Sequence, residues 1–171
     1  MTSSPFNGIA LVAQADIETP LGPLRALATE RGLAGLWFDA CKHHPGSFDV
    51  PLDHAHPHIA AARQWFAAYW VGADPDVHAL ALDPQGTPFQ RAVWSALLEI
   101  PLGATSTYGE MAARAGNPAA SRAAGAAIGR NPLTIVVPCH RVIGRDGSLT
   151  GYAAGLPRKE ALLRHEGVLL A

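Results

Sequence analysis

The residues best suited to chemistry stand side by side at Cys139 and His140. The thiolate is the nucleophilic form of cysteine, and a neighbouring imidazole can help to form it. The apolar run from Leu133 to Val137 predicts a buried strand that ends at this pair. An arbitrary cysteine is more often a small buried side chain, and an arbitrary histidine an ordinary hydrogen-bonded one. The two residues alone therefore identify only a candidate nucleophile.

A second unusual segment is a predicted helix that starts after Asn117, its expected N-cap, and runs to about Ile128. Small residues surround a single long cation, Arg122. Such a helix can bring its backbone close to another surface, inside the protein or outside it. A buried, unpaired guanidinium is costly, so we expect the helix to lie in a DNA groove with Arg122 projecting into it.

The elements around these segments are expected to be helical. An apolar residue recurs every three or four positions after Thr87, the predicted N-cap, and Pro88: Phe89, Val93, Leu97 and Ile100. Thr107 and Glu110 form a capping-box pattern that opens a short helix through Arg114. This helix and the one after Asn117, joined by a Gly-containing turn, predict a helix-turn-helix.

The first half predicts a small α/β domain. Strands are expected over residues 9–15, 24–29 and 33–38, separated by turn residues. A helix is expected over residues 58–71, with one apolar side made of Ile59, Ala62, Phe66, Tyr69 and Trp70. The turn-rich connector at residues 83–88 then divides the chain into domains 1–83 and 84–171.

Composition favours a globular protein of a reducing compartment. The 171 residues are 49% hydrophobic and 16% charged, enough for a buried core. Two cysteines are too few for a disulfide framework, and we find neither an export signal nor a membrane-spanning run, so a cytoplasmic location without membrane contact is expected. The net charge of −1 divides into −5 for residues 1–83 and +4 for residues 84–171. Only the second half is thus suited to a polyanion, although chance clustering would give the same pattern.

The segment around Cys139 resembles the active-site signature of the O6-alkylguanine-DNA alkyltransferases, the methylated-DNA–protein-cysteine methyltransferases. The signature reads Pro138-Cys139-His140-Arg141-Val142, preceded by Gly129-Arg130-Asn131-Pro132 and followed by Gly151-Tyr152. The resemblance extends from residue 87 to residue 167 and is looser in the first half, at residues 19–24 and 37–38. It implies an α/β N-terminal domain, with a small antiparallel sheet and a helix. A mostly helical C-terminal domain with a winged helix-turn-helix-like DNA-binding unit would follow.

The resemblance also implies roles in the transfer step. Cys139 would accept the alkyl group once and irreversibly, after His140 deprotonates it through a water, with Glu166 holding the imidazole. Asn131 would brace the active-site turn. Tyr108 would stand near N3 of the guanine, where a proton is supplied as the purine leaves.

Recognition of the damaged base is implied in the same way. The backbone carbonyls of Cys139 and Val142 would accept from the exocyclic amine, and backbone N–H groups near Tyr152 and Ala153 would face the O6 atom. Because the base must be turned out of the duplex, Arg122 would enter the vacated space. The minor groove around it would be lined by Ala120, Ser121, Ala123 and Gly125. The implied partner is double-stranded DNA with O6-alkylguanine, bound by a monomer without a cofactor; the choice between this base and O4-alkylthymine stays open.

Three other functions fit part of the sequence. A helix-turn-helix regulator would explain the second half but not the set of Cys139, His140 and Glu166. A Cys-His hydrolase would leave Arg122 and its small-residue helix without a role. An alkyltransferase-like lesion-binding protein recognises the same base without transfer, but in that group the acceptor cysteine is replaced, commonly by Trp. The presence of Cys139 favours transfer.

Two positions depart from known relatives. Ser121 stands where many relatives have Ala, and Ala153 where some have Ser.

Some relatives also carry a structural zinc in the N-terminal domain, and this chain has Cys41 close to histidines within residues 43–58. Their spacing matches no closed zinc pattern, so we expect a polar His-rich loop and no metal.

Overall fold

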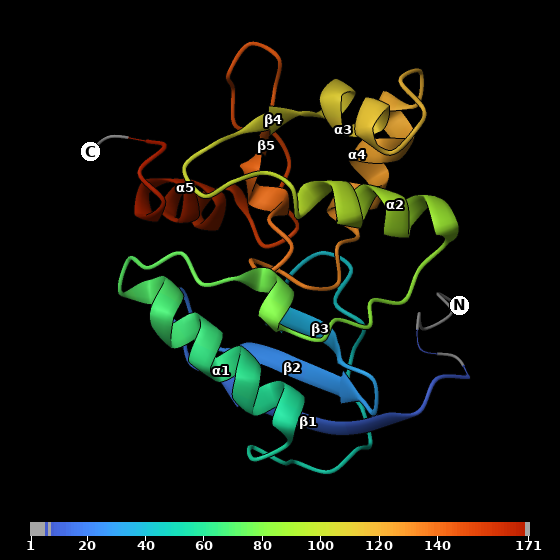
Figure 1. Ribbon diagram of the computed structural model, residues 1–171, viewed down its shortest axis with the longest axis vertical. Coiled ribbons are helices and arrows are strands. Elements are labelled where there is room, and N and C mark those ends of the chain that lie inside the picture. The colour runs from blue at the N-terminus through green and yellow to red at the C-terminus, as the bar shows by residue number, and fades with distance from the viewer. Residues whose placement is uncertain (1–5, 7, 170–171) are drawn as a thin grey trace. The chain divides into compact units, whose positions relative to one another are not determined.

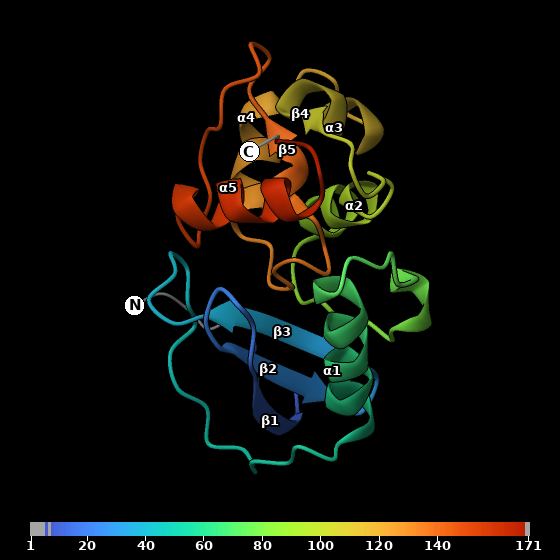
Figure 2. The same ribbon diagram turned by 90° about the vertical axis from the view of Figure 1, so that its left-hand side faces the viewer.

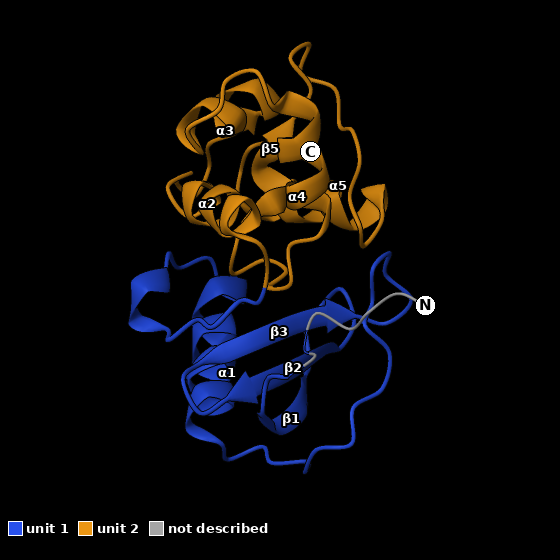
Figure 3. Ribbon diagram, turned by 90° about the vertical axis from the view of Figure 1, so that its right-hand side faces the viewer, with its two compact units in different colours: residues 1–85 blue, residues 86–171 orange. Residues whose placement is uncertain are grey.

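The computed structural model describes residue 6 and residues 8–169 of the chain. The chain divides into two compact units, residues 1–85 and residues 86–171 (Figures 1 and 3). The first unit is α/β and the second is mostly helical, so the fold class expected from the sequence is confirmed. No helix in the described part of the chain is long and apolar enough to cross a membrane.

The first unit is built on a three-stranded antiparallel sheet in the order β1-β2-β3. Its strands are β1 (Leu11–Ile17), β2 (Leu24–Thr29) and β3 (Leu33–Phe38). The helix α1 (Pro57–Trp70) covers one face of this sheet and contacts all three strands (Figures 1 and 2). Every residue of β3 is buried.

Two details of this unit differ from the sequence prediction. The first strand lies two residues later than expected, because the N–H of Ile9 donates to the carbonyl of Phe6 in a turn instead of joining the sheet. On α1, Trp65 is buried and stacks on Tyr69 with ring centroids 5.3 Å apart, whereas Trp70 is only half-buried. The ring stack favours Trp65 as the core residue.

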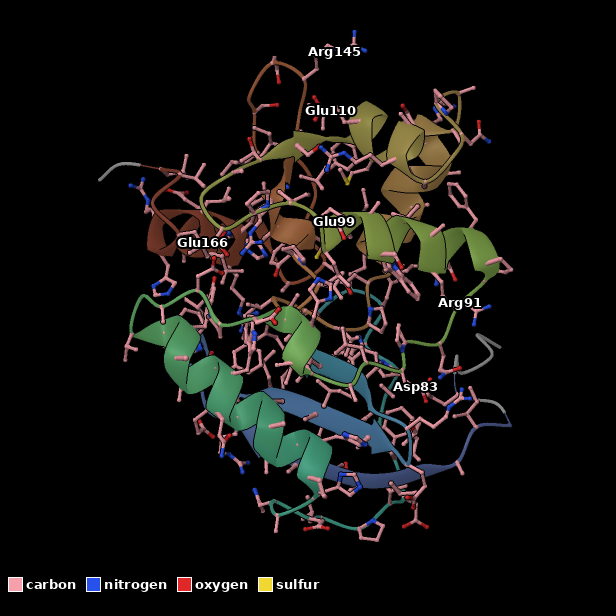
Figure 4. All side chains as sticks on the ribbon, viewed as in Figure 1. Asp83, Arg91, Glu99, Glu110, Arg145 and Glu166 are labelled. Atoms are coloured by element: carbon pink, nitrogen blue, oxygen red, sulfur yellow. The ribbon has the colours of Figure 1, made fainter. Side chains whose placement is uncertain are left out.

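The end of the first unit is fastened to the β2–β3 hairpin. A short 3₁₀ turn, η1 (Val77–Ala79), leads into a single bridge between Leu33 and Leu82. The next residue, Asp83, accepts a hydrogen bond from the Thr29 hydroxyl at 2.6 Å (Figure 4). These contacts hold the connector against the sheet up to the point where the second unit begins.

The second unit surrounds a short parallel strand pair with four helices. The helices are α2 (Pro88–Leu97), α3 (Tyr108–Arg114), α4 (Ser121–Gly129) and α5 (Leu156–His165). The paired strands are β4 (Ser106–Thr107) and β5 (Val142–Ile143), and a 3₁₀ turn, η2 (Cys139–Arg141), precedes β5. Helices α2, α3 and α4 pack on one another, with the Trp94 indole donating to the Ala127 carbonyl at 2.8 Å.

Asn117 is not the N-cap of the fourth helix, which corrects the sequence prediction. Gly116, with φ of 92°, ends α3, and the N–H of Asn117 then donates back to the carbonyl of Ala112. Asn117 therefore closes the preceding helix. A turn follows, and α4 starts only at Ser121, with Ala120 at the N-cap position and no side-chain cap.

Candidate active site

The residues before Cys139 form a tight turn, so the predicted strand over Leu133 to Val137 is wrong. The N–H of Val137 donates to the carbonyl of Leu133 at 2.9 Å, and Ile135 adopts φ of 74°. This conformation is unfavourable for a β-branched residue and needs support from its surroundings. The Asn131 side chain provides it, since its amide donates to the Val137 carbonyl at 2.7 Å and its oxygen accepts from the Leu133 N–H at 2.9 Å.

This turn delivers Cys139 and His140 to the interior of the second unit. Both residues are buried, and Nε2 of His140 lies 2.6 Å from Oε1 of Glu166. A carboxylate can only accept, so a neutral imidazole in this contact carries its proton on Nε2. Its other nitrogen, Nδ1, is buried and has no hydrogen-bond partner among the described residues. His140 thus presents an unprotonated nitrogen on the side away from Glu166.

Burial opposes charge on both the thiol and the imidazole. It raises the pKa of the Cys139 thiol, while the Asn131 side chain and the charge of Lys159 act in the opposite direction. It lowers the pKa of His140, against the effect of Glu166. A thiolate at this position therefore needs a base to take the proton and a positive charge to stabilise the anion.

Arg141 holds the carboxylate of Glu166 with two hydrogen bonds. Its Nε lies 2.9 Å from Oε2, and its terminal nitrogen lies 3.0 Å from Oε1. The other terminal nitrogen donates to the carbonyl of Ile100 at 2.7 Å. Burial raises the pKa of Glu166, but the hydrogen bonds from His140 and Arg141 outweigh it and lower the pKa to about 2. Glu166, at the end of α5 (Figure 4), therefore stays ionised.

Lys159 is a buried cation that the sequence analysis missed. Its ammonium donates to the carbonyls of Val142 at 2.6 Å, Thr150 at 2.7 Å and Gly151 at 3.2 Å. The signal was in the sequence, because Lys159, Leu162 and Leu163 stand at positions i, i+3 and i+4 of α5, and Glu166 follows at i+7 as its C-cap; all four are buried. A lysine at such a position is placed on the buried side of its helix.

The start of α3 brings Tyr108 beside the loop that contains Thr150 and Gly151. Thr107 caps the helix in the predicted capping box with Glu110 (Figure 4), and β4 pairs with β5 immediately after η2. The Tyr108 phenol donates to the carbonyl of Thr150 at 3.1 Å. Its ring lies close to Gly125 of α4, where an added Cβ would stand 3.5 Å away. This distance is an ordinary van der Waals contact, so α4 and the Tyr108 ring are neighbours at Gly125.

The small residues of α4 form an open surface. Ser121, Arg122 and Ala123 are exposed, and Ala120 and Gly125 are half-buried. Arg122 makes no hydrogen bond or ion pair with any residue that the structure describes. An unpartnered cation on a small-residue helix is available to an external anion.

The residues expected to recognise the base belong to two segments, the end of the Cys139 turn and the segment before α5. The carbonyl of Cys139 accepts from the N–H of Val142, and the carbonyl of Val142 accepts from Lys159. Each carbonyl oxygen has two lone pairs, so each keeps one for a ligand. Tyr152 and Ala153 are half-buried in the segment that leads to α5.

The chain is similar to known proteins over nearly its whole length. The family model for the DNA-binding domain of 6-O-methylguanine DNA methyltransferase matches residues 88–168. A methylated-DNA–protein-cysteine methyltransferase of Methanosarcina acetivorans is 47% identical over 88% of this chain and 95% of its own. One from Salmonella typhimurium is 46% identical over 90% and 95%. The chain belongs to the methylated-DNA–protein-cysteine methyltransferase family.

A solved structure of this methyltransferase family extends the agreement to the fold. Mycobacterium tuberculosis OGT in complex with DNA superposes with a TM-score of 0.83 at 42% identity, covering 91% of this chain and 93% of that chain. This similarity includes most of the first unit, where the sequence resemblance is looser.

The His-rich loop of this methyltransferase is held by ordinary contacts. His58 lies 3.2 Å from the carbonyl of Glu30, and Nδ1 of His54 lies 3.2 Å from Arg63. Cys41 packs against the apolar cluster of Phe6, Leu27, Ala34 and Trp37. Within residues 6 and 8–169, no three His, Cys, Asp or Glu side chains are grouped as a metal ion requires.

Proposed function

We propose that this protein repairs DNA by moving a methyl or other alkyl group from the O6 atom of guanine to Cys139. Its substrate is double-stranded DNA, approached through the minor groove by a monomer, and the activity belongs in the cytoplasm. The observation that carries the proposal is the buried His140–Glu166 pair, which directly follows the buried Cys139 in the chain. This pair provides a base for a nucleophile in the unit that also carries Arg122.

The nucleophile forms by proton transfer to His140. The thiol proton of Cys139 passes through a water to Nδ1, the imidazole nitrogen with no partner among the described residues. Glu166 accepts from Nε2 and stabilises the imidazolium that results. Asn131 fixes the turn that presents the sulfur.

In the transfer step, the sulfur attacks the alkyl carbon and the bond between that carbon and O6 breaks. A neutral thioether forms on Cys139, and the electron pair of the broken bond stays with the guanine. Tyr108 supplies a proton to N3, and the tyrosinate that remains is reprotonated from the His140 imidazolium through solvent, so that the net change is one proton moved from the thiol to the purine. The free lone pairs of the Cys139 and Val142 carbonyls accept from the exocyclic amine, and backbone N–H groups near Tyr152 and Ala153 face O6.

Turning the base out of the duplex is the task of α4. Its exposed small residues permit close contact with the groove floor, and Arg122 fills the space that the base leaves. Ala120, Ser121, Ala123 and Gly125 line the groove around it. The minor groove carries little sequence information, which suits a protein that must act in any sequence context.

A lesion-binding protein without transfer is the alternative that shares this surface. Cys139 and the His140–Glu166 pair favour transfer, because binding alone needs neither. The test compares wild-type protein with C139A on duplex DNA that carries labelled O6-methylguanine. We expect label on the wild-type protein, none on C139A, and binding of the modified duplex by both. Label on C139A, or none on either protein, contradicts the proposal.

A further inference from the structure

Thr150 contacts the Tyr108 phenol through both its carbonyl and its hydroxyl. The carbonyl accepts from the phenol at 3.1 Å, and the hydroxyl Oγ1 donates to the phenol oxygen at 3.3 Å. Among the described residues, no other group forms a hydrogen bond with this phenol. Thr150 is therefore placed to control the group that, under the proposed function, protonates the departing purine.

The backbone of Thr150 is held on both sides of the phenol contact. The preceding loop closes on itself, because the N–H of Gly144 donates to the carbonyl of Ser148 at 2.8 Å. The carbonyl of Thr150 accepts a second hydrogen bond, from the Lys159 ammonium at 2.7 Å. Both lone pairs of that carbonyl are then used. The hydroxyl is the part of Thr150 that can respond when the phenol changes its protonation state.

Loss of the phenol proton changes what the phenol oxygen requires. In the free protein the phenol hydrogen points to the Thr150 carbonyl, so it must turn about the C–O bond to reach N3 of the purine. Once the proton has gone, the tyrosinate oxygen can only accept, and the Thr150 hydroxyl is a donor already in contact with it. Hydrogen bonds to a charged group are roughly twice as strong as neutral ones. This contact therefore strengthens as negative charge develops on Tyr108.

We propose that Thr150 is a positioning residue for the proton transfer from Tyr108 to the departing guanine. Its carbonyl holds the phenol in place before the transfer, and its hydroxyl stabilises the tyrosinate after the proton has moved to N3. Thr150 keeps its own proton throughout, and the tyrosinate regains one from the His140 imidazolium through solvent. This inference rests on the proposed function, in which Tyr108 is the proton donor.

The experiment compares T150V, T150S and S148A with wild type in the reaction with free O6-benzylguanine. T150V keeps the branched shape and the backbone carbonyl but removes the hydroxyl, whereas T150S keeps the hydroxyl. S148A is the matched control, because the Ser148 hydroxyl is in the same loop but donates to Asp146. Thr150 is exposed, so the lost hydrogen bond to a charged oxygen should slow T150V by about tenfold, the lower end for such bonds. T150S should regain most of the rate, and S148A should match wild type.

A second substrate separates an effect on proton transfer from a general effect on the loop. O6-Benzyl-3-deazaguanine has a carbon in place of N3, so it offers Tyr108 no atom to protonate there. All four proteins should react with this analogue at the same rate, which also shows that each variant is folded and that Cys139 reacts normally. In a Y108F background, T150V should cause no further loss with O6-benzylguanine, because its partner is already absent.

Three results overturn the inference: a T150V that reacts with O6-benzylguanine like wild type, a loss of the same factor with both compounds, or an equal loss in S148A. A T150V effect that persists in the Y108F background does so as well. Wild-type protein that takes no methyl group from O6-methylguanine duplex would instead refute the proposed function, whatever the variants do.

Discussion

Replacing Glu166 with Gln removes one buried charge and leaves the shape of the side chain almost unchanged. Glu166 holds Arg141 through two hydrogen bonds and His140 through one of 2.6 Å, all of them buried. E166Q leaves the guanidinium of Arg141 without its counter-ion and turns an amide N–H toward a donor. Breaking a buried pair in this way costs about 3–5 kcal/mol. For a chain of this length, that corresponds to a Tm about 6–20 °C lower.

The matched control is E160Q, which makes the same chemical change on the same helix. Glu160 pairs with Arg164 on the surface, with both side chains nearly half exposed. Such pairs contribute about 0.5 kcal/mol or less, so E160Q should melt close to wild type. Reaction with free O6-benzylguanine should slow about a hundredfold in E166Q and stay unchanged in E160Q.

The pH dependence of the difference between wild type and E166Q gives a further check. The pKa of Glu166 lies at about 2 in the folded protein, against 4.5 for an ordinary glutamate. Its contribution to the free energy of unfolding is therefore complete above pH 4.5 and is lost as the pH falls toward 2. The stability gap between the two proteins should narrow over that range. Equal melting of E166Q and E160Q at neutral pH, or a gap that widens on acidification, would refute this reasoning.

Three further predictions concern Arg122, the spent protein and Lys159. R122A should slow repair of duplex DNA far more than reaction with free O6-benzylguanine, which needs no base extrusion; an equal loss on both substrates would make Arg122 structural. Protein methylated on Cys139 should melt about 2–12 °C below fresh protein in calorimetry, because an added methyl group in a packed interior costs about 1–3 kcal/mol; an unchanged Tm would show that the turn accommodates it. Burial lowers the pKa of Lys159 to about 8 from the usual 10.5. Between these two pH values, the unfolded chain keeps a proton on Lys159 that the native protein loses. The free energy of unfolding of wild type relative to K159M should therefore rise between these pH values in denaturant titrations, and a constant difference would argue against a buried charge.

Local signals predicted most of the elements. The capping box at Thr107 and Glu110 opens α3 where the sequence indicated, and Thr87 caps α2 in the same way. Both predictions rest on hydrogen bonds within one turn of helix, which the sequence specifies directly. Asn117 failed as an N-cap because it closes the preceding helix and α4 starts only at Ser121, and two competing local uses cannot be ranked from the sequence alone.

The active-site turn could not be predicted from periodicity. Leu133 to Val137 has the composition of a buried strand, yet the Asn131 side chain supplies the hydrogen bonds that let Ile135 adopt a left-handed conformation. An apolar run shows that a segment is buried but not how its backbone is bonded. The family resemblance located Cys139 and His140, but the pairing of Arg141 with Glu166 and the burial of Lys159 depend on contacts across the fold.

The central claim is that Cys139 takes one alkyl group and cannot be restored. A thioether has no acidic proton and no good leaving group, so each molecule should act once. The decisive measurement mixes the protein with a large molar excess of O6-methylguanine duplex, follows the repaired guanine over time, and maps the modified peptide by mass spectrometry. We predict that repair stops at one equivalent per protein molecule and that a single methyl group is found, on Cys139. Repair of several lesions per molecule without added reductant or cofactor, or a methyl group on any other residue, would contradict the account.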